Sequence, residues 1–271
     1  MAESYLRHFG LSKPPFAKEV SDAELWLPPS KEGVVDEVVE ALEARESLSI
    51  VGEPGVGKTC VLRAVRHRLP TETFRLTYCH NATLGRRDFY RQLCLAMGLS
   101  PSATAAAVFY AVSTHVQDLG QDKVHPVFLL DEAHMLHHDT FGHLHILLNY
   151  EWDSRALLSL VLVGLPELRD RLEMRRNRSL YSRLQRRLVI EPTTPEDTAE
   201  YLRFRLKLAG CDKEIFTSDA ITVLHEAALG ALRDLDRVTT GALRIAARRK
   251  RKLVERDVVT DAVALDTPSS S

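Results

Sequence analysis

Short apolar runs alternate with amphipathic stretches through the first two thirds of the chain. The runs have the length of strands, and their continuous apolar character is typical of a parallel sheet that is covered on both faces. They predict strands at 48–51, 74–79, 127–130, 157–164 and 188–190. Apolar residues at helical spacing predict helices at 30–44, 60–69, 87–97 and 103–119. Strands alternating with helices in this way predict a doubly wound α/β fold with a parallel sheet.

The remainder of the chain shows helical periodicity only. Its apolar positions predict helices at 196–209, 218–229, 233–252 and 255–264. We therefore expect an α/β domain over residues 31–192, a small all-helical domain over 193–265 and a disordered polar tail at 266–271. Residues 1–30 are rich in aromatic residues and prolines, which predicts an extended arm packed on the core instead of a free tail.

Composition narrows the class of protein. The chain has 271 residues, enough for one large domain or for a large and a small one. Its net charge of −1 excludes a uniformly basic nucleic-acid binder but allows a local basic patch. Four scattered cysteines without a C-x-x-C pair predict neither disulfides nor a zinc knuckle, and the five histidines between 134 and 145 lack the spacing of a zinc motif. No apolar run approaches the roughly 20 residues that span a bilayer, so we expect a cytoplasmic protein without membrane contact.

The residues that follow the first strand predict a phosphate-binding loop. Residues 52–59 fit the pattern G-x-x-x-x-G-K-[ST], in which backbone N–H groups cradle phosphates and the lysine reaches the β- and γ-oxygens. The strand before it and the helix after it supply the context that this motif needs. Thr59 is placed to offer its hydroxyl to Mg²⁺. We expect the nucleotide to contact Gly52, Glu53, Pro54, Gly55, Val56, Gly57, Lys58, Thr59 and Cys60.

Two acidic residues close the third predicted strand. Asp131 is positioned to hold Mg²⁺, because that ion prefers carboxylate and phosphate oxygens. Glu132 is the candidate that orients and polarises the attacking water. An acidic pair at the end of a buried strand can also serve solvation alone. The phosphate-binding loop earlier in the chain favours the catalytic interpretation.

The order of these motifs resembles that of AAA+ ATPases of the initiator-like branch. More closely, the chain resembles the ExeA/TnsC/TniB group, which comprises ATPases of transposons and insertion sequences with relatives in secretion. The resemblance extends from about Phe9 to Ala264. It is carried by Phe9-Gly10-Leu11 with Pro15-Phe16, by Leu129-Leu130-Asp131-Glu132-Ala133-His134, by Asp153-Ser154 ahead of Val161-Leu162-Val163-Gly164, and by Leu208-Ala209-Gly210. It implies a P-loop AAA+ fold with a helical lid, ATP and Mg²⁺ as cofactors, and hydrolysis of ATP to ADP and phosphate.

The resemblance also implies roles for arginines. Arg183, ahead of the last predicted strand, matches the finger that reaches the γ-phosphate held by the neighbouring subunit, and it would act together with Lys58 and Glu132. Arg186 is the second choice for the finger, and a solvated basic helix end is the alternative for the whole stretch. Arg233, in the lid, matches the second sensor.

One position departs from the pattern of the group. Relatives usually place a polar residue at the first sensor, where this chain has Leu165, and the departure predicts slow intrinsic hydrolysis. Asn81, after the second predicted strand, could hold Glu132 away from the water until a partner binds.

Basic residues suggest where DNA would bind. The run Arg248-Arg249-Lys250-Arg251-Lys252 suits either a solvated helix end or contact with phosphates, and the sequence does not decide between them. Arg86 and Arg87 are the better candidates for lining a pore through which DNA passes. Aromatic residues do not accompany either patch, so contact would be to the backbone and independent of base sequence.

These observations support one leading hypothesis and two alternatives. The leading hypothesis is an ATP-dependent regulator of DNA transposition, which forms a homo-oligomer (ring, spiral or filament) on double-stranded DNA and recruits or activates a transposase. The first alternative is a secretion-type, ExeA-like ATPase. The second is a slow nucleotide-switch adaptor that does not bind DNA.

Overall fold

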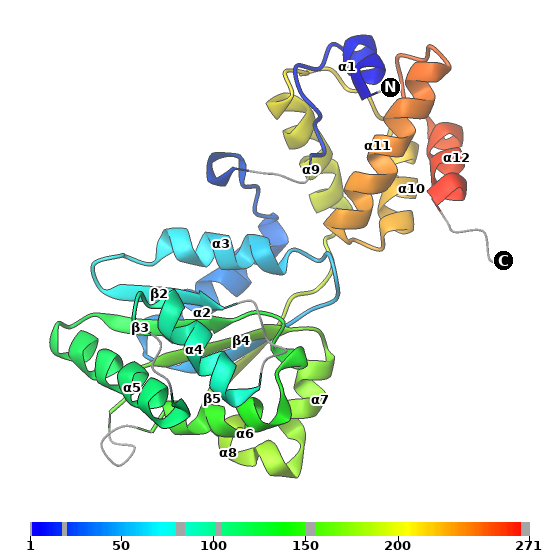
Figure 1. Ribbon diagram of the computed structural model, residues 1–271. Coiled ribbons are helices and arrows are strands. Elements are labelled where there is room, and N and C mark those ends of the chain that lie inside the picture. The colour runs from blue at the N-terminus through cyan, green and yellow to red at the C-terminus, as the bar shows by residue number, and fades with distance from the viewer. Residues whose placement is uncertain (1, 18–20, 80–84, 101–103, 150–154, 267–271) are drawn as a thin grey trace. The chain divides into compact units, whose positions relative to one another are not determined.

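Figure 1 shows the computed structural model of the chain, which describes residues 2–17, 21–79, 85–100, 104–149 and 155–266. The chain separates into two compact parts. We call residues 33–53 and 61–190 the sheet unit, and residues 1–32, 54–60 and 191–271 the helical unit. Within the described residues, every helix is too short or too polar to cross a bilayer.

The sheet unit is built on parallel strands in the order β2-β3-β4-β1-β5. The strands are β1 (Ser47–Val51), β2 (Phe74–Cys79), β3 (His125–Leu130), β4 (Ser159–Gly164) and β5 (Leu184–Val189). Every residue of β1, β3 and β4 is buried, whereas burial is partial along the edge strands β2 and β5. Covered central strands read as continuous apolar runs, so the predicted doubly wound parallel sheet is confirmed.

Helices accompany the sheet and close its core. They are α2 (Glu32–Glu43), α3 (Lys58–Arg68), α4 (Arg86–Ala96), α5 (Ala105–Gln121), α6 (His138–Leu147), α7 (Glu167–Glu173) and α8 (Arg178–Tyr181). Phe128 and Leu130 of β3 pack in one hydrophobic cluster with Tyr90 of α4, Val112 of α5 and Phe141 of α6. The sequence predicted the first four helices and missed the last three, which are short.

The helical unit contains the C-terminal helices that the sequence predicted. They are α9 (Pro195–Leu208), α10 (Ser218–Ala228), α11 (Leu232–Arg248) and α12 (Arg256–Asp266). Thr194 and Asp197 form a capping box at the start of α9, with Pro195 in the first turn. Helix α11 ends four residues before the predicted position, because Arg249 caps it and Lys250 adopts a left-handed conformation (φ 56°).

The N-terminal arm packs on the core of the helical unit. Trp26 lies against Tyr201 of α9 with 5.1 Å between ring centroids, and Phe16 is buried in the same cluster. The buried Arg205 donates hydrogen bonds to the carbonyl oxygens of Pro15 (2.6 Å) and Ala17 (3.1 Å). The prediction of an extended conformation was wrong for the first residues, since Ala2–Phe9 forms the amphipathic helix α1.

Two predicted element boundaries also need correction. Helix α2 begins at Glu32, and Ser30 lies in a 3₁₀ turn (Pro29–Lys31), where its hydroxyl donates to the carboxylate of Asp197. Strand β5 begins at Leu184, four residues before the predicted start at 188. Three consecutive polar residues, Gln185, Arg186 and Arg187, lie in this edge strand, and the sequence pattern therefore resembled a loop.

Candidate nucleotide-binding site

The loop between β1 and α3 has the backbone conformation that phosphate binding requires. Its first residue, Gly52, donates a hydrogen bond to the carbonyl oxygen of Gly164 at the end of β4 (3.2 Å). Gly55 (φ 83°) and Gly57 (φ 103°) are left-handed, a conformation that glycine adopts without steric cost. Helix α3 then starts at Lys58, so that its first N–H groups follow the turn directly. Turn and helix start together have the arrangement in which backbone N–H groups and the helix dipole can face an anion.

The start of α11 packs on this loop within the helical unit. The N–H of Leu232 donates to the carbonyl oxygen of Gly55 at 3.0 Å. A Cβ placed on Gly55 would lie 3.2 Å from Cβ of Ala231 and 3.4 Å from Cβ of Arg233. The side chain of Arg233 is exposed. The structure therefore brings the arginine predicted as the second sensor next to the phosphate-binding loop.

The carboxylate of Asp131 is held at the end of β3 by two donors. Tyr78 of β2 donates its hydroxyl to Oδ2 at 2.7 Å, and the N–H of Glu132 donates to Oδ1 at 2.9 Å. Burial raises the pKa of Tyr78, and the hydrogen bond to Asp131 raises it further. Tyr78 is thus a donor over the physiological pH range. A carboxylate fixed in this way retains lone pairs for a hard cation such as Mg²⁺.

Parallel strands bring Gly52 and the acidic pair to one edge of the sheet. Val51 at the end of β1 is paired with Gly164 of β4, and Leu130 at the end of β3 is paired with Leu162 of β4. Gly52 and Asp131 therefore follow strand ends that flank β4. The carboxyl edge of a doubly wound sheet is the place where ligands bind in such folds.

Glu132 stands in a strained backbone conformation. Its φ of 53° is left-handed, which costs a non-glycine residue about 1–3 kcal/mol. Its side chain is 48% exposed, and Oε2 lies 3.5 Å from Nδ1 of His134. An exposed carboxylate on a turn that the fold keeps strained is suited to contact a water molecule.

Arg171 fixes the segment that follows the acidic pair. Its guanidinium donates to the carbonyl oxygens of His134 and Leu136, the latter at 2.7 Å, and lies 4.5 Å above the ring of Phe141. Burial lowers the pKa of Arg171, and Arg176 lowers it further. No sequence pattern distinguishes Arg171 from the other arginines between 169 and 187, because its partners are backbone atoms far away in the chain.

Comparisons with known proteins agree with this geometry. Residues 41–172 match the family model described as AAA domain. Over 259 residues the chain is 32% identical to general secretion pathway protein A of Aeromonas hydrophila, covering 94% of this chain and 47% of that protein. The structure is similar to Drosophila ORC bound to DNA (TM-score 0.72, 20% identity, 98% of this chain and 67% of that chain). It is also similar to Cdc6p from Pyrobaculum aerophilum (TM-score 0.68, 16% identity, 90% and 70%).

The chain has the AAA+ fold. Its order of strands, its P-loop and its C-terminal helical lid correspond to the fold expected from the sequence. It is homologous to general secretion pathway protein A, and it spans about half the length of that relative.

The AAA+ chain carries several arginines near β5, and their contacts differ. Arg183 lies between α8 and β5 and donates to the carbonyl oxygen of Ser179 at 3.2 Å. Arg186 is on β5 and pairs with Glu46 (2.8 Å) and Glu40 (3.4 Å) of the same unit. Glu40 and Glu46 therefore hold Arg186 within the sheet unit.

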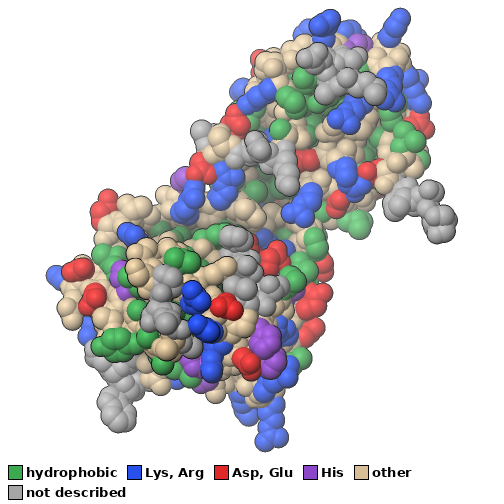
Figure 2. Space-filling model, in the orientation of Figure 1, with side chains coloured by type: hydrophobic (Ala, Val, Ile, Leu, Met, Phe, Trp, Pro, Cys, Tyr) green, Lys and Arg blue, Asp and Glu red, His purple; other side chains and the backbone are tan. Residues whose placement is uncertain are grey.

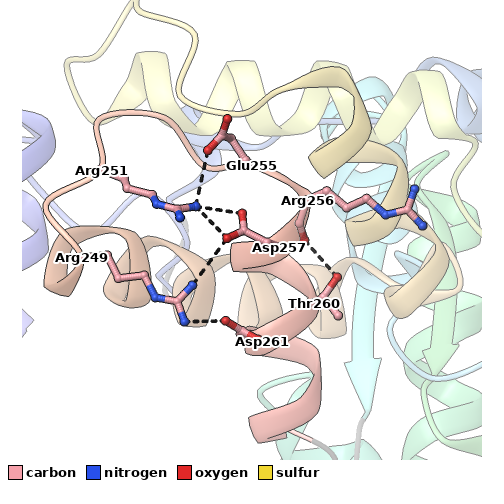
Figure 3. Close-up of polar contacts among 7 residues, drawn as sticks. All are labelled: Arg249, Arg251, Glu255, Arg256, Asp257, Thr260 and Asp261. Carbon is pink, nitrogen blue, oxygen red and sulfur yellow. Dashed lines mark hydrogen bonds and ion pairs between the residues drawn. The ribbon is translucent and has the colours of Figure 1, made fainter.

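Ion pairs inside the lid engage the basic run at the end of α11. Arg251 contacts Glu255 (3.4 Å) and Asp257 (2.7 Å), and Arg249 contacts Asp257 (3.7 Å) and Asp261 (Figure 3). These carboxylates lie at and just before the N-terminal turns of α12. Lys252 donates to the carbonyl oxygen of His8 at 2.8 Å. Of the two interpretations that the sequence left open, these contacts favour a structural role for the basic run over contact with phosphates.

Other predicted residues are placed less completely. Arg86 and Arg87 are exposed in the first turn of α4. On the face shown in Figure 2, basic and acidic side chains are interspersed, as the small net charge suggests. Asn81, Asp153 and Ser154 lie outside the described residues.

Two of the histidines that lack the spacing of a zinc motif lie beside Asp139, which the sequence did not single out. Donor atoms of His137, His138 and Asp139 lie within 4.8 Å of one another at the exposed start of α6. These side chains contact each other, and nothing further in the structure indicates a ligand there, so we assign no site to them.

Proposed function

We propose that this AAA+ chain is a Mg²⁺-dependent ATPase that works as a nucleotide switch. The observation that carries the proposal is the left-handed turn at Gly55 and Gly57, which follows β1 and leads directly into the start of α3 at Lys58. In this proposal Lys58 reaches the β- and γ-oxygens of the nucleotide. Thr59 and Asp131 hold the Mg²⁺, which neutralises charge on the transferring phosphoryl group.

Hydrolysis then depends on Glu132 and on Arg233. Glu132 orients the attacking water through its exposed carboxylate. Arg233 contributes positive charge from the start of α11, whose backbone already contacts the loop at Gly55. The apolar side chain of Leu165 supplies no polar group to the γ-phosphate or the water, so we expect slow turnover, which suits a switch better than a motor.

ATP binding and turnover by the purified chain test this proposal. Lys58→Ala should lose binding of a fluorescent ATP analogue, whereas Glu132→Gln should keep binding and lose turnover. Lys207→Ala, an exposed change on α9, is the matched control and should leave both unchanged. Failure of the wild-type chain to bind ATP would refute the proposal.

We further propose that the active assembly is a homo-oligomer in which Arg183 reaches the nucleotide of a neighbour. The support is that Arg186 is engaged by Glu40 and Glu46, while Arg183 follows a short helix next to the edge strand β5. A mixing experiment tests this. Arg183→Ala and Lys58→Ala should each be inactive alone, and mixing them should restore part of the activity, because mixed interfaces combine an intact loop with an intact finger. Absence of any recovery on mixing contradicts a finger acting between subunits.

The cellular role with the best support is that of a secretion-type ATPase. The support is the 32% identity with general secretion pathway protein A of Aeromonas hydrophila over 94% of this chain. Structural ion pairs within the basic run at the end of α11 remove one of the two reasons to expect DNA binding. Affinity capture with the chain held in the ATP state by Glu132→Gln should recover components of a cell-envelope complex, and capture of a transposase instead would overturn this role.

The second candidate is the transposition regulator on double-stranded DNA. Its specific support is the exposed pair Arg86 and Arg87 at the start of α4, together with the sequence resemblance to transposon ATPases. Retention of ATP-bound protein on duplex DNA should be lost in Arg86→Glu/Arg87→Glu and kept in the control Lys207→Ala. If the wild-type chain is not retained and DNA does not change its turnover, this candidate fails and the secretion-type or adaptor role stands.

A further inference from the structure

His134 lies between the acidic pair and the end of β4. Its Nδ1 accepts a hydrogen bond from the N–H of Leu165 at 3.3 Å, and the same atom is 3.5 Å from Oε2 of Glu132. The side chain is only 13% exposed, so its position is set by its neighbours rather than by solvent. One imidazole thus contacts both the proposed catalytic carboxylate and the position of the first sensor.

The fold holds this imidazole closely. A Cβ placed on Gly164 would lie 3.1 Å from Nδ1 and 3.2 Å from the backbone nitrogen of His134, so an alanine at 164 would push the ring away. Arg171 donates to the carbonyl oxygen of His134 from the opposite end of the peptide unit. Backbone and ring of His134 are therefore both fixed by residues of β4 and α7.

The hydrogen bond from Leu165 needs a lone pair on Nδ1 of the ring. An Nδ1 that accepts a hydrogen bond carries no proton, and a neutral imidazole then has its proton on Nε2. Nδ1 in this state cannot donate to Glu132. The carboxylate is therefore left able to contact water, while the ring limits where it can lie.

Leu165 makes this contact significant for the reaction. Its side chain has no polar atom, and its backbone N–H is bound by His134. The link between the end of β4 and Glu132 therefore runs through the imidazole instead of through a side chain of β4.

We propose that His134 is a positioning residue for ATP hydrolysis, which sets the place of the Glu132 carboxylate by bonding its turn to the end of β4. The inference rests on the proposed ATPase function. It requires that the loss of His134 impairs the hydrolytic step and leaves nucleotide binding intact, because the contacts described for the imidazole are with Leu165, Glu132 and the end of β4.

Steady-state kinetics of three variants test the proposal. His134→Ala should lower kcat about five- to tenfold, the effect of losing one hydrogen bond in an active site, with the Kd for an ATP analogue unchanged. His134→Asn should recover most of kcat, because its Oδ1 can accept from Leu165 in place of Nδ1. His138→Ala, a neighbouring exposed histidine, is the control and should behave as the wild type.

A second variant tests the role of the imidazole if His134→Ala is unstable. Gly164→Ala leaves the imidazole in the chain but displaces it, so kcat should fall while the Kd stays constant. Wild-type kcat in His134→Ala, or a kcat in His134→Asn no better than in His134→Ala at equal Tm, overturns the proposal. A wild-type chain without turnover that depends on Lys58 and Glu132 overturns the ATPase function itself, and the inference with it.

Discussion

Replacing Gly55 with alanine tests whether the loop must keep its present backbone. Gly55 has a φ of 83°, and an L-residue in the left-handed region costs roughly 1–2 kcal/mol. The added methyl would also lie 3.2 Å from Cβ of Ala231 and 3.4 Å from Cβ of Arg233, closer than the roughly 3.5–4.0 Å optimum between carbon atoms. The substitution therefore combines a conformational penalty with crowding against the start of α11.

Gly98 separates these two contributions. It has a φ of 76° and nothing within 4 Å of an added Cβ, so Gly98→Ala carries the conformational penalty alone. We expect Gly98→Ala to lower the free energy of unfolding by roughly 1–2 kcal/mol. Gly55→Ala should lower it by about 1–3 kcal/mol more, because overpacking adds to the penalty.

Nucleotide binding distinguishes the two variants more sharply than stability does. Relief of the crowding requires the loop or α11 to shift, and a displaced N–H no longer meets the phosphates. Gly55→Ala should therefore weaken binding of a fluorescent ATP analogue about tenfold or more, the cost of one or two hydrogen bonds to charged groups. Gly98→Ala should bind as the wild type does. Urea unfolding and fluorescence titration measure both effects, and equal stability and affinity in the two variants would refute the reasoning.

Three further outcomes are expected. Tyr78→Phe removes the donor at 2.7 Å from Asp131, so the Mg²⁺ concentration for half-maximal turnover should rise about tenfold, and an unchanged value would contradict the orienting role. Burial raises the pKa of Asp236 from its ordinary value of 3.8 to about 6, so the folded chain binds more protons than the unfolded chain between these two pH values. Stability therefore falls as pH rises through this window. Urea unfolding should therefore show Asp236→Asn gaining roughly 2–3 kcal/mol on the wild type between about pH 4 and pH 7, and parallel pH profiles would contradict the shift. Arg251→Ala should lower the Tm, because the ion pair with Asp257 is lost, and the difference from the wild type should shrink in about 1 M NaCl. A Tm difference that persists at this salt concentration would contradict an exposed ion pair as its cause.

The sequence predicted the central strands because their burial is complete. Every residue of β1, β3 and β4 is buried, and strands that are buried on both faces appear in the sequence as consecutive apolar residues. β5 was placed too late because Gln185, Arg186 and Arg187 separate Leu184 from the apolar end of the strand. The ion pairs of Arg186 with Glu40 and Glu46 explain why arginine is tolerated in that strand. No local sequence pattern indicates these ion pairs, because their partners are far apart in the chain.

The candidate site divides in the same way. A phosphate-binding loop is recognisable because its chemistry depends on consecutive backbone groups, and consecutive groups leave a pattern at fixed spacing. Tyr78 was not predicted, since it reaches Asp131 only through the pairing of β2 with β3, where Tyr78 lies opposite Leu129. No positioning role was predicted for His134, because its contact with Leu165 depends on the neighbouring strand β4.

Helix α11 connects the features of the helical unit that concern the nucleotide. At its start, Leu232 bonds the loop through Gly55; one turn later, Asp236 accepts a hydrogen bond from Tyr201 at 2.6 Å. Tyr201 in turn packs against Trp26 of the arm. The helix is continuous over 17 residues and is buried along one face. A change of the loop on nucleotide binding must therefore either break the bond at Gly55 or displace α11 together with the arm, which makes this helix the element through which a nucleotide switch would act.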